Sequence, residues 1–503
     1  MDSTRTRPLT RSLTRRQLLT LQPARPRSRR NRDPRRPAPR SATLSPVHHL
    51  LNRITWGPRP EEVARAEELG YEATLEEQLH PEELDDSEAE ALLAAIPILE
   101  MDRRAVHGLV DSEYRTHKAL IQGLLVRAVH SRRQLLERMV EFWTDHFNIP
   151  GEGYSEDLVA LHRDVIRKHA LGNFRDLLVG TAKSPAMLVY LDNYVNMAEH
   201  PNENYARELL ELHTLGVDGG YTEQDVKEVA RAFTGWTEHP RTRTGFYFNL
   251  EEHDTGVKRV LGHTLPAGRG IEDGLHVLSI VARHPSTARF LCRKLCVRFV
   301  SDDPPDSLVE GMAQVWQETD GAIRPVLRHL FLSPEFQASQ GQKLRRPLDF
   351  FVGALRATGT RIHEWWVLDE MLTELGQIPY GWHPPDGYPD VAPAWISTSG
   401  LLARWNVAMR LTHGVYSDAG EWGYGMRTEL RERIGEPRTV GDLVDAVASQ
   451  VFGAPLLGQD RDFFVRYAAD GGDAATPVDA LLLGRKLGSL YGLMLASPQF
   501  QWR

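Results

Sequence analysis

A polar run at residues 201–216, PNENYARELLELHTLG, gathers carboxylate, amide, guanidinium and imidazole side chains in one segment. If the run is helical, Asn204, Arg207, Glu208 and Glu211 share one face. Two carboxylates on a buried face need cationic partners; Arg207 supplies one, and a metal ion or a substrate cation supplies another. Two glutamates at this spacing can also divide the roles of acid and base. The run therefore predicts an acid/base or metal-assisted site, with Glu208 and Glu211 as ligands of any divalent cation.

The same run also fits a purely structural role. Glu203, Arg207 and Glu211 are spaced four residues apart and can form ion pairs along a helix, each worth a few tenths of a kcal/mol. His213 follows Glu211 by two positions, whereas a helical zinc motif needs ligands one turn apart. If it is buried, such a network can specify one packing arrangement without doing chemistry. Both interpretations stay open on the sequence alone.

The segment ERMVEFWTDHFN, residues 137–148, is a second candidate. Its acidic side chains recur every four residues and so line one helical face, namely Glu137, Glu141 and Asp145. His146 continues the buried stripe that is predicted from Leu135, Met139 and Phe142. A histidine in that position is either a catalytic group or a core residue with its hydrogen bonds satisfied.

Two further stretches contain acidic residues in turns. The run HDTGVK places Asp254 beside His253, a pair also found in metal-dependent phosphohydrolases, although there it lies on a helix among other spaced ligands. The run PPDGYPDVAPAW, residues 384–395, is rich in proline and aromatic residues and contains Asp386. Loops of this kind line pockets or cover a core. Asp254 is retained as a catalytic candidate and Asp386 as a binding candidate.

The elements that must position these residues are mostly amphipathic helices from residue 45 onward. Thr222 and Asp225 are spaced as a capping box at the start of another helix. The β signal lies at 245–265, where GFYFNL and the following run, turning at Thr255-Gly256, predict one small hairpin. We therefore expect a mainly α, large multi-helix domain over 45–503. A C-terminal subdomain is expected from about residue 427, with its boundary in SDAGEWGYGM, residues 417–426.

The first 44 residues differ from the rest in composition. Residues 1–43 hold thirteen Arg and two Asp, whereas the chain as a whole has a net charge of −8. Such a segment buries too little apolar surface to offset the entropy of ordering, so a disordered tail is predicted. A basic arm can touch nucleic acid or anionic lipid, but the tail has no interleaved aromatic residues, which disfavours nucleic acid.

The tail also bears on the compartment. The run LTRRQLLTL, residues 13–21, resembles a twin-arginine export signal, but the apolar segment that should follow is missing. The run is either a decayed signal or a chance match in an Arg-rich tail, so we expect a cytoplasmic protein, or an exported one if the motif is functional. The chain has no run of about 18 apolar residues, so no membrane span is predicted.

Several motifs together resemble one known family. The runs HLLNRITWGPRPEEV, FWTDHFN, LDN, NENYARELLELHTLGVDGG, HDTGVKRVLG, SPEFQ and PPDGYP occur in the order typical of the bacterial "domain of unknown function 1800" family. The resemblance covers about residues 46–503 and implies a predominantly helical protein without an assigned activity. It also implies that Asn204, Lys258, Trp236 and Asp386 match family motif positions. These four residues and Asp192 are the binding candidates. Relatives often carry a twin-arginine leader and occur beside genes for a phosphatase-like uncharacterised family, which implies a partner protein of that kind.

Two functional hypotheses follow from these patterns. The first is a hydrolase-like acid/base or metal-assisted enzyme, with a pocket where 137–148, 203–215 and the hairpin meet. Its catalytic candidates are Glu208, Glu211, Arg207, His146 and Asp254. The second is a non-catalytic helical scaffold or a secretion-associated binding protein, in which the same cluster is a structural lock.

Overall fold

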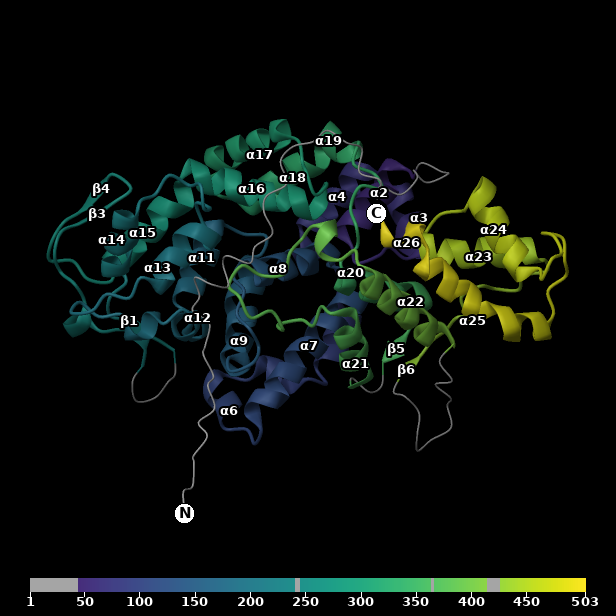
Figure 1. Cartoon of the computed structure of the whole chain (residues 1–503), viewed down its shortest axis with the longest axis horizontal. Coiled ribbons are helices and arrows are strands. Elements are labelled where there is room, and N and C mark those ends of the chain that lie inside the picture. The colour runs from purple at the N-terminus through teal and green to yellow at the C-terminus, as the bar shows by residue number, and fades with distance from the viewer. Residues whose placement is uncertain (1–43, 240–244, 363–365, 414–425) are drawn as a thin grey trace, which may run out of the picture. The chain divides into compact units, whose positions relative to one another are not determined.

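The structure, a computed structural model, describes residues 44–239, 245–362, 366–413 and 426–503. These residues form mainly α-helices, as predicted (Figure 1). The basic tail, its twin-arginine-like motif and nearly all of the expected boundary segment lie outside the described residues. A separate C-terminal subdomain from about residue 427 stays a prediction.

The N-terminal helices begin and end at residues typical of helix caps. Ser45 accepts a hydrogen bond from the backbone of His48, and Pro46 occupies the first helical position. Gly70 has φ +90° and lies between two helices: the first ends just before it and the second begins just after it. The helices of this part are α2 (Pro46–Ile54), α3 (Pro60–Leu69), α4 (Tyr71–Leu79), α5 (Ser87–Leu93), α6 (Arg103–His107), α7 (Ser112–His130), α8 (Gln134–His146), α9 (Ser155–Leu161), α10 (Arg167–His169), α11 (Phe174–Ala182) and α12 (Pro185–Tyr190).

The polar run of 201–216 is helical but irregular. It forms α13 (Asn204–Glu208) and then a π-helical turn, η5 (Leu209–His213). A π turn adds one residue per turn, which rotates Glu211 away from the face that an α-helix would give it. The next helix, α14 (Glu223–Ala232), starts with the predicted capping box of Thr222 and Asp225.

The β structure differs from the predicted pairing. Strand β2 (Phe246–Phe248), from the run GFYFNL, pairs antiparallel with β1 (Trp236–Glu238) rather than with the strand that follows it. The hairpin is instead formed by β3 (Lys258–Val260) and β4 (His263–Leu265), and Leu261 and Gly262 lie at its turn with positive φ. The predicted turn at Thr255-Gly256 was therefore wrong. A third pair joins β5 (Arg361–Ile362) to β6 (Met426–Arg427).

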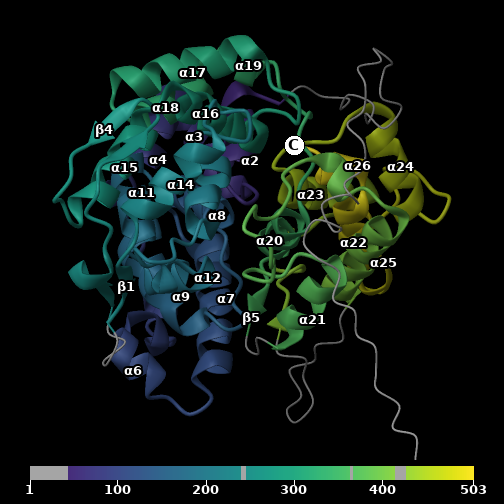
Figure 2. The ribbon, with the colours of Figure 1, turned by 60° about the vertical axis from the view of Figure 1, so that its left-hand side comes forward.

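Among the remaining helices, some pack against the next helix in the sequence and others against helices further along the chain. Helix α16 packs against α17, and α22 packs against both α20 and α25 (Figures 1 and 2). Their bounds are α15 (Glu272–Arg283), α16 (Pro285–Phe299), α17 (Asp306–Glu318), α18 (Ile323–Leu332), α19 (Pro334–Gln337), α20 (Pro347–Thr358), α21 (Trp366–Leu375), α22 (Thr398–His413), α23 (Val440–Phe452), α24 (Gly458–Ala468), α25 (Ala480–Ala496) and α26 (Pro498–Gln501).

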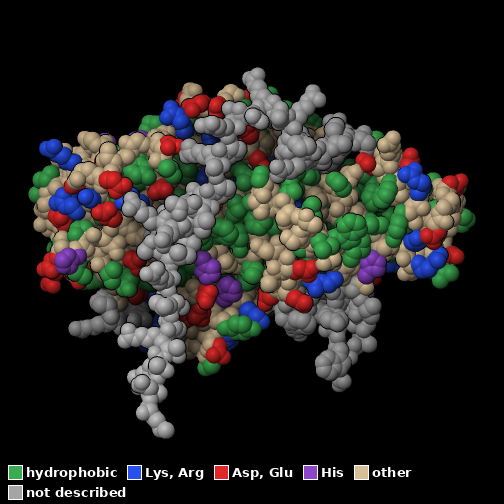
Figure 3. Space-filling model, viewed as in Figure 1, with side chains coloured by type: hydrophobic (Ala, Val, Ile, Leu, Met, Phe, Trp, Pro, Cys, Tyr) green, Lys and Arg blue, Asp and Glu red, His purple; other side chains and the backbone are tan. Residues whose placement is uncertain are grey.

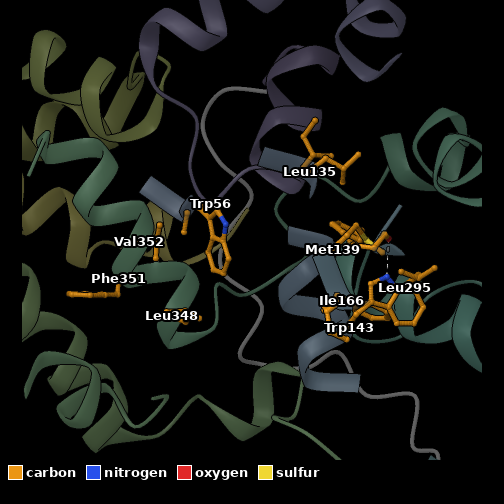
Figure 4. Close-up of a cluster of buried hydrophobic side chains, with 14 of the residues drawn as sticks. Trp56, Leu135, Met139, Trp143, Ile166, Leu295, Leu348, Phe351 and Val352 are labelled. Carbon is orange, nitrogen blue, oxygen red and sulfur yellow. Dashed lines mark hydrogen bonds between the residues drawn. The ribbon is translucent and has the colours of Figure 1, made fainter. Parts of the chain in front are cut away.

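The buried stripe predicted on α8 is confirmed. Leu135 and Met139 are fully buried, and Trp143 continues the stripe next to Leu295 of α16 within one hydrophobic cluster (Figure 4). Burying a side chain of this size contributes about 1.5–3 kcal/mol. The apolar face of α8 thus packs in the core, and its acidic face contacts other elements.

The surface carries charges of both signs. On the face drawn in Figure 3, the described Lys and Arg side chains lie intermixed with Asp and Glu. Across the residues that the structure describes, no helix has the length and apolar character that a bilayer span requires.

Candidate functional site

A pocket of about 400 Å³ opens between α8, α16 and the loop at 382–390. Three segments far apart in the sequence meet here. Aromatic and aliphatic side chains form part of the wall, and charged groups form the rest. The lining side chains used below are Phe142, Asp145, His146, Phe290, Lys294, Arg298, Trp382, Asp386, Tyr388 and Asp390.

The loop is held near the C-terminal end of α8 by hydrogen bonds from side chains to backbone carbonyls. Asn148 donates two hydrogen bonds from its amide, to the carbonyls of Trp382 (2.8 Å) and Pro384 (2.7 Å). The Tyr388 hydroxyl donates to the carbonyl of Ile378 at 2.8 Å. These bonds fix the loop close to the end of α8, so Trp382 and Tyr388 form a preformed wall.

Gly387 allows the closest approach of this loop. It adopts φ +73°, and a Cβ placed there would lie 2.0 Å from the carbonyl oxygen of Asp145. We expect Gly387→Ala to cost more than the roughly 1–3 kcal/mol of backbone strain alone, because the loop must also move. Urea unfolding would measure the loss. Gly376→Ala is the matched control, since Gly376 has φ +78° and open space around it; equal losses in both variants would contradict the close approach.

Lys294 and His146 face each other in the pocket. The His146 Nε2 group donates to the carbonyl of His213 at 3.0 Å, which leaves Nδ1 as an acceptor. Lys294 Nζ lies 3.0 Å from that Nδ1 atom and donates to it. The π-helical turn η5 therefore contributes to the site by setting the tautomer of His146.

Burial controls the protonation of this pair. Burial lowers the pKa of Lys294 to about 8, against the opposing attraction of Asp145, Asp386 and Asp390. Burial also lowers the pKa of His146 well below its ordinary value, and the charge of Lys294 adds to the effect. The pair therefore presents a neutral imidazole and an amine whose pKa lies near 8.

The carboxylates of the pocket differ in environment. Burial raises the pKa of Asp145, although Arg346 donates to it at 2.6 Å. Burial would also raise the pKa of Asp390, but Lys343, Arg298 and Arg346 hold it well below the ordinary value. Asp386 is exposed and accepts a hydrogen bond from Trp382 Nε1 at 2.8 Å.

A buried network of ion pairs supports the floor of the pocket. Glu141 of α8 pairs with both Arg298 and Arg346, and the side chains of all three are at most 5% exposed. The network extends to Asp349, which pairs with Arg138 and Arg503. Asp390 joins it through Arg298 (3.2 Å) and Lys343 (3.1 Å). In the acidic stripe predicted on α8, Glu141 and Asp145 thus pair with arginines of α16 and the start of α20, whereas Glu137 pairs with Arg167 of α10.

Three buried histidines make the protein sensitive to acid. Burial lowers the pKa of His162 and of His213 to about 3, and that of His146 is also strongly lowered. The unfolded chain takes up these protons below about pH 6.5 and the folded chain does not, so stability falls as pH falls from about 6.5 towards 3.

We expect each of these histidines to contribute a slope of about 1.4 kcal/mol per pH unit. The urea midpoint measured at several pH values between 7 and 4 checks this slope. His162→Gln should make the profile shallower by about one proton, which separates the histidines from the carboxylates. An unchanged slope in that variant would contradict the assignment.

The predicted carboxylate cluster lies elsewhere. Arg207 makes a bidentate pair with Glu223 (2.7 and 2.8 Å) and a further bond to Glu203 at 3.2 Å. The predicted pairing of Arg207 with Glu203 is confirmed, and Glu223 is the partner that the sequence interpretation missed. Glu208 is buried and Glu211 is half-buried, but neither lines the 400 Å³ pocket. Their catalytic or metal-binding role stays a prediction.

Asn204 and Asp192 lie beside this cluster. Asn204 donates to the Asp192 carboxylate at 3.3 Å, and Asp192 has a left-handed backbone at φ 58°. In the described ranges, no group of three or more His, Cys, Asp or Glu residues is arranged to hold a metal ion.

Asp254, Lys258 and Trp236 belong to a third region, around β1 and the β3–β4 hairpin. The carboxylate of Asp254 pairs with Arg231 at 2.7 Å, and the fully buried Lys258 pairs with Asp273 at 2.7 Å. Trp236 is fully buried; its ring packs so close to Gly274 that a Cβ there would lie 2.5 Å away. Of the ten predicted site residues, only His146 and Asp386 line the pocket.

The family assignment rests on a match along nearly the whole chain. The family model described as "Protein of unknown function (DUF1800)" matches residues 49–502. The chain belongs to this family. Comparisons of this DUF1800 protein with curated proteins and with solved structures gave no match.

Sequence reasoning missed Lys294 and Arg298 in this DUF1800 chain. Both lie in the run CRKLCVRF of α16, among buried residues such as Leu291 and Leu295. A pair of cations four residues apart, next to such a stripe, was the available signal. This signal alone does not predict a buried amine, because basic residues on helices are mostly exposed.

Proposed function

We propose that this protein is a hydrolase-like acid/base enzyme whose site is the pocket around Lys294. The observation that carries the proposal is the 3.0 Å contact between Lys294 Nζ and His146 Nδ1 within a pocket of about 400 Å³. A general base works best when its pKa lies near the working pH, and burial brings Lys294 into that range. Clefts that combine apolar walls with perturbed titrating groups are the usual place for catalysis.

Each polar group has a distinct role in this proposal. Lys294 exchanges the proton, and His146 holds the amine in place as a fixed acceptor. Asp386, at the pocket mouth, orients a polar group of the substrate or receives the proton. Trp382 and Tyr388 provide the apolar surface that binds the rest of the substrate.

Hydrolysis of p-nitrophenyl acetate tests the proposal. The wild-type protein should accelerate hydrolysis with a pH dependence that follows deprotonation of an amine. Lys294→Met should lower the rate by 10²-fold or more, as is typical for loss of a catalytic acid or base. The exposed pair Arg283–Asp320 offers the control, because Asp320→Asn lies far from the pocket lining and should leave the rate unchanged. Equal rates in wild type and Lys294→Met would contradict the proposal.

The second candidate function is a binding protein or scaffold in which the Asn204–Glu211 segment is a structural lock. The ion pairs of Arg207 with Glu203 and Glu223 favour it, since they hold α13 to the start of α14. The hydrolysis assay separates the two candidates: a scaffold should not accelerate hydrolysis, and Glu208→Gln should then only lower its stability. Loss of hydrolysis in that variant together with full activity in Lys294→Met would move the site to the predicted carboxylate cluster.

Other parts of the proposal rest on the family resemblance or on sequence alone. They are a divalent cation at Glu208 and Glu211, a phosphatase-like partner protein, bacterial origin and export through the twin-arginine-like motif. Metal analysis of the purified protein tests the first. Co-purification with the neighbouring gene product tests the second.

A further inference from the structure

The amine of Lys294 lacks the ion pair that most buried lysines have. Within the described residues, no carboxylate oxygen lies within 4 Å of its Nζ atom, and its hydrogen bond goes to the neutral ring of His146. The ring centre of Phe290 lies 5.6 Å from Nζ. An amine that donates one N–H to an imidazole keeps its lone pair for another group. This arrangement suits a nucleophile better than a structural cation.

The other cations of the pocket are already paired. Arg298 pairs with Glu141 and with Asp390, and Arg293 pairs with Asp306 at the surface. The pocket therefore offers no excess of free guanidinium groups for a phosphate or a sulfate. The uncharged part of its wall is largely aromatic, built from Phe142, Phe290, Trp382 and Tyr388.

We propose that Lys294 forms an imine with the aldehyde or ketone group of a small aromatic or apolar compound. This inference deepens the proposed function and rests on the same pocket. Lysines that are desolvated in apolar pockets are the ones that form Schiff bases with carbonyl substrates. The volume of about 400 Å³ lies within the range of small-molecule sites.

The chemistry balances without an oxidant or a reductant. The Nζ lone pair attacks the carbonyl carbon, and a proton passes from Nζ to the carbonyl oxygen to give a carbinolamine. The hydroxyl group then leaves as water together with the second Nζ proton, and the C=N bond remains. Asp145 and Asp386 line the same pocket and can carry these protons, while His146 keeps the amine directed at the carbonyl carbon.

Reductive trapping tests the inference on the full-length protein. The protein is incubated at pH 8 with 4-nitrobenzaldehyde and sodium cyanoborohydride, and peptides are quantified by mass spectrometry over time. Lys294 should acquire the adduct at least tenfold faster than the exposed Lys227 of α14, with a stoichiometry near one. Labelling spread over surface lysines without preference for Lys294 would overturn the inference. Because all lysines compete within the wild-type chain, this readout does not depend on the folding of a variant.

A variant and a second assay separate this inference from the proposed function. Lys294→Met should lose the selective adduct, and His146→Phe, which removes the acceptor, should slow its formation several-fold. If ester hydrolysis requires Lys294 but no selective adduct forms, the acid/base function stands and the imine is rejected. If hydrolysis and selective labelling are both absent, both proposals are rejected.

Discussion

Lys294→Met is expected to remove the reactivity of the pocket and to make the folded protein more stable at neutral pH. A buried ammonium group destabilises the folded state, and burial lowers the pKa of Lys294 from 10.5 to about 8. Each unit of such a shift corresponds to about 1.4 kcal/mol. Because the side chain is only half-buried and water screens part of this cost, we expect a gain of about 1–2 kcal/mol at pH 7.

The stability gain of Lys294→Met should depend on pH. Between pH 8 and 10.5 the unfolded chain keeps the proton that folded Lys294 releases, so wild-type stability rises with pH across this window. Below pH 8 both states are protonated and the full cost of burying the charge applies. The advantage of Lys294→Met should therefore shrink from pH 7 to pH 10.

Urea unfolding at pH 7 and pH 10 measures both quantities. Lys227→Met on the exposed side of α14 is the matched control and should change stability by less than about 0.5 kcal/mol. A Lys294→Met variant that is less stable than wild type at pH 7 would show that Lys294 is a structural residue.

Asp349→Ala is expected to cost about 3–5 kcal/mol, because it leaves buried arginines without their counter-ion. The Asp349 side chain is 1% exposed; it pairs with Arg138 and, at 3.1 Å, with Arg503. Burial would raise its pKa, but the surrounding arginines hold it well below the ordinary value. Several positive charges would remain in a site that excludes water.

Unfolding of Asp349→Ala by urea is compared with Asp320→Asn, which removes an exposed charge and keeps a residue that tolerates the left-handed backbone of Asp320 (φ 51°). Asp320 pairs with Arg283 at 2.8 Å, but their side chains are 56% and 61% exposed. Exposed pairs contribute about 0–1 kcal/mol, so the control should be nearly neutral. Similar losses in the two variants would contradict the view that the buried network holds the pocket floor.

The helices were predictable because their signals are local. The capping box of Thr222 and Asp225 and the buried stripe of α8 depend on residues within one or two turns. The pairing of the strands was not predictable. The alternation of side chains in β2 fits pairing with the strand that follows it as well as pairing with β1. In the structure β2 pairs with β1, whose Trp236 ring packs against Gly274.

The site was less predictable because it combines three distant segments. The sequence marked His146 and Asp386, and both line the pocket. It favoured Glu208 and Arg207 because carboxylates and an arginine lie close together along the chain. The π-helical turn at 209–213 contains Glu211, so Glu211 departs from the regular α-helical spacing. Arg207 pairs with Glu223, sixteen residues further along the chain. No pattern in the sequence around Lys294 predicts its contact with His146, because only the tertiary fold brings the two residues together.

The titration of the Lys294 amine tests the central claim most directly. Trace labelling with 1-fluoro-2,4-dinitrobenzene between pH 6 and 11, read peptide by peptide, gives the midpoint of its reactivity. The account predicts a midpoint near pH 8, with a reactivity above that of exposed lysines at pH 7.5. A midpoint near 10.5, or a Lys294 that stays unlabelled throughout, would contradict it.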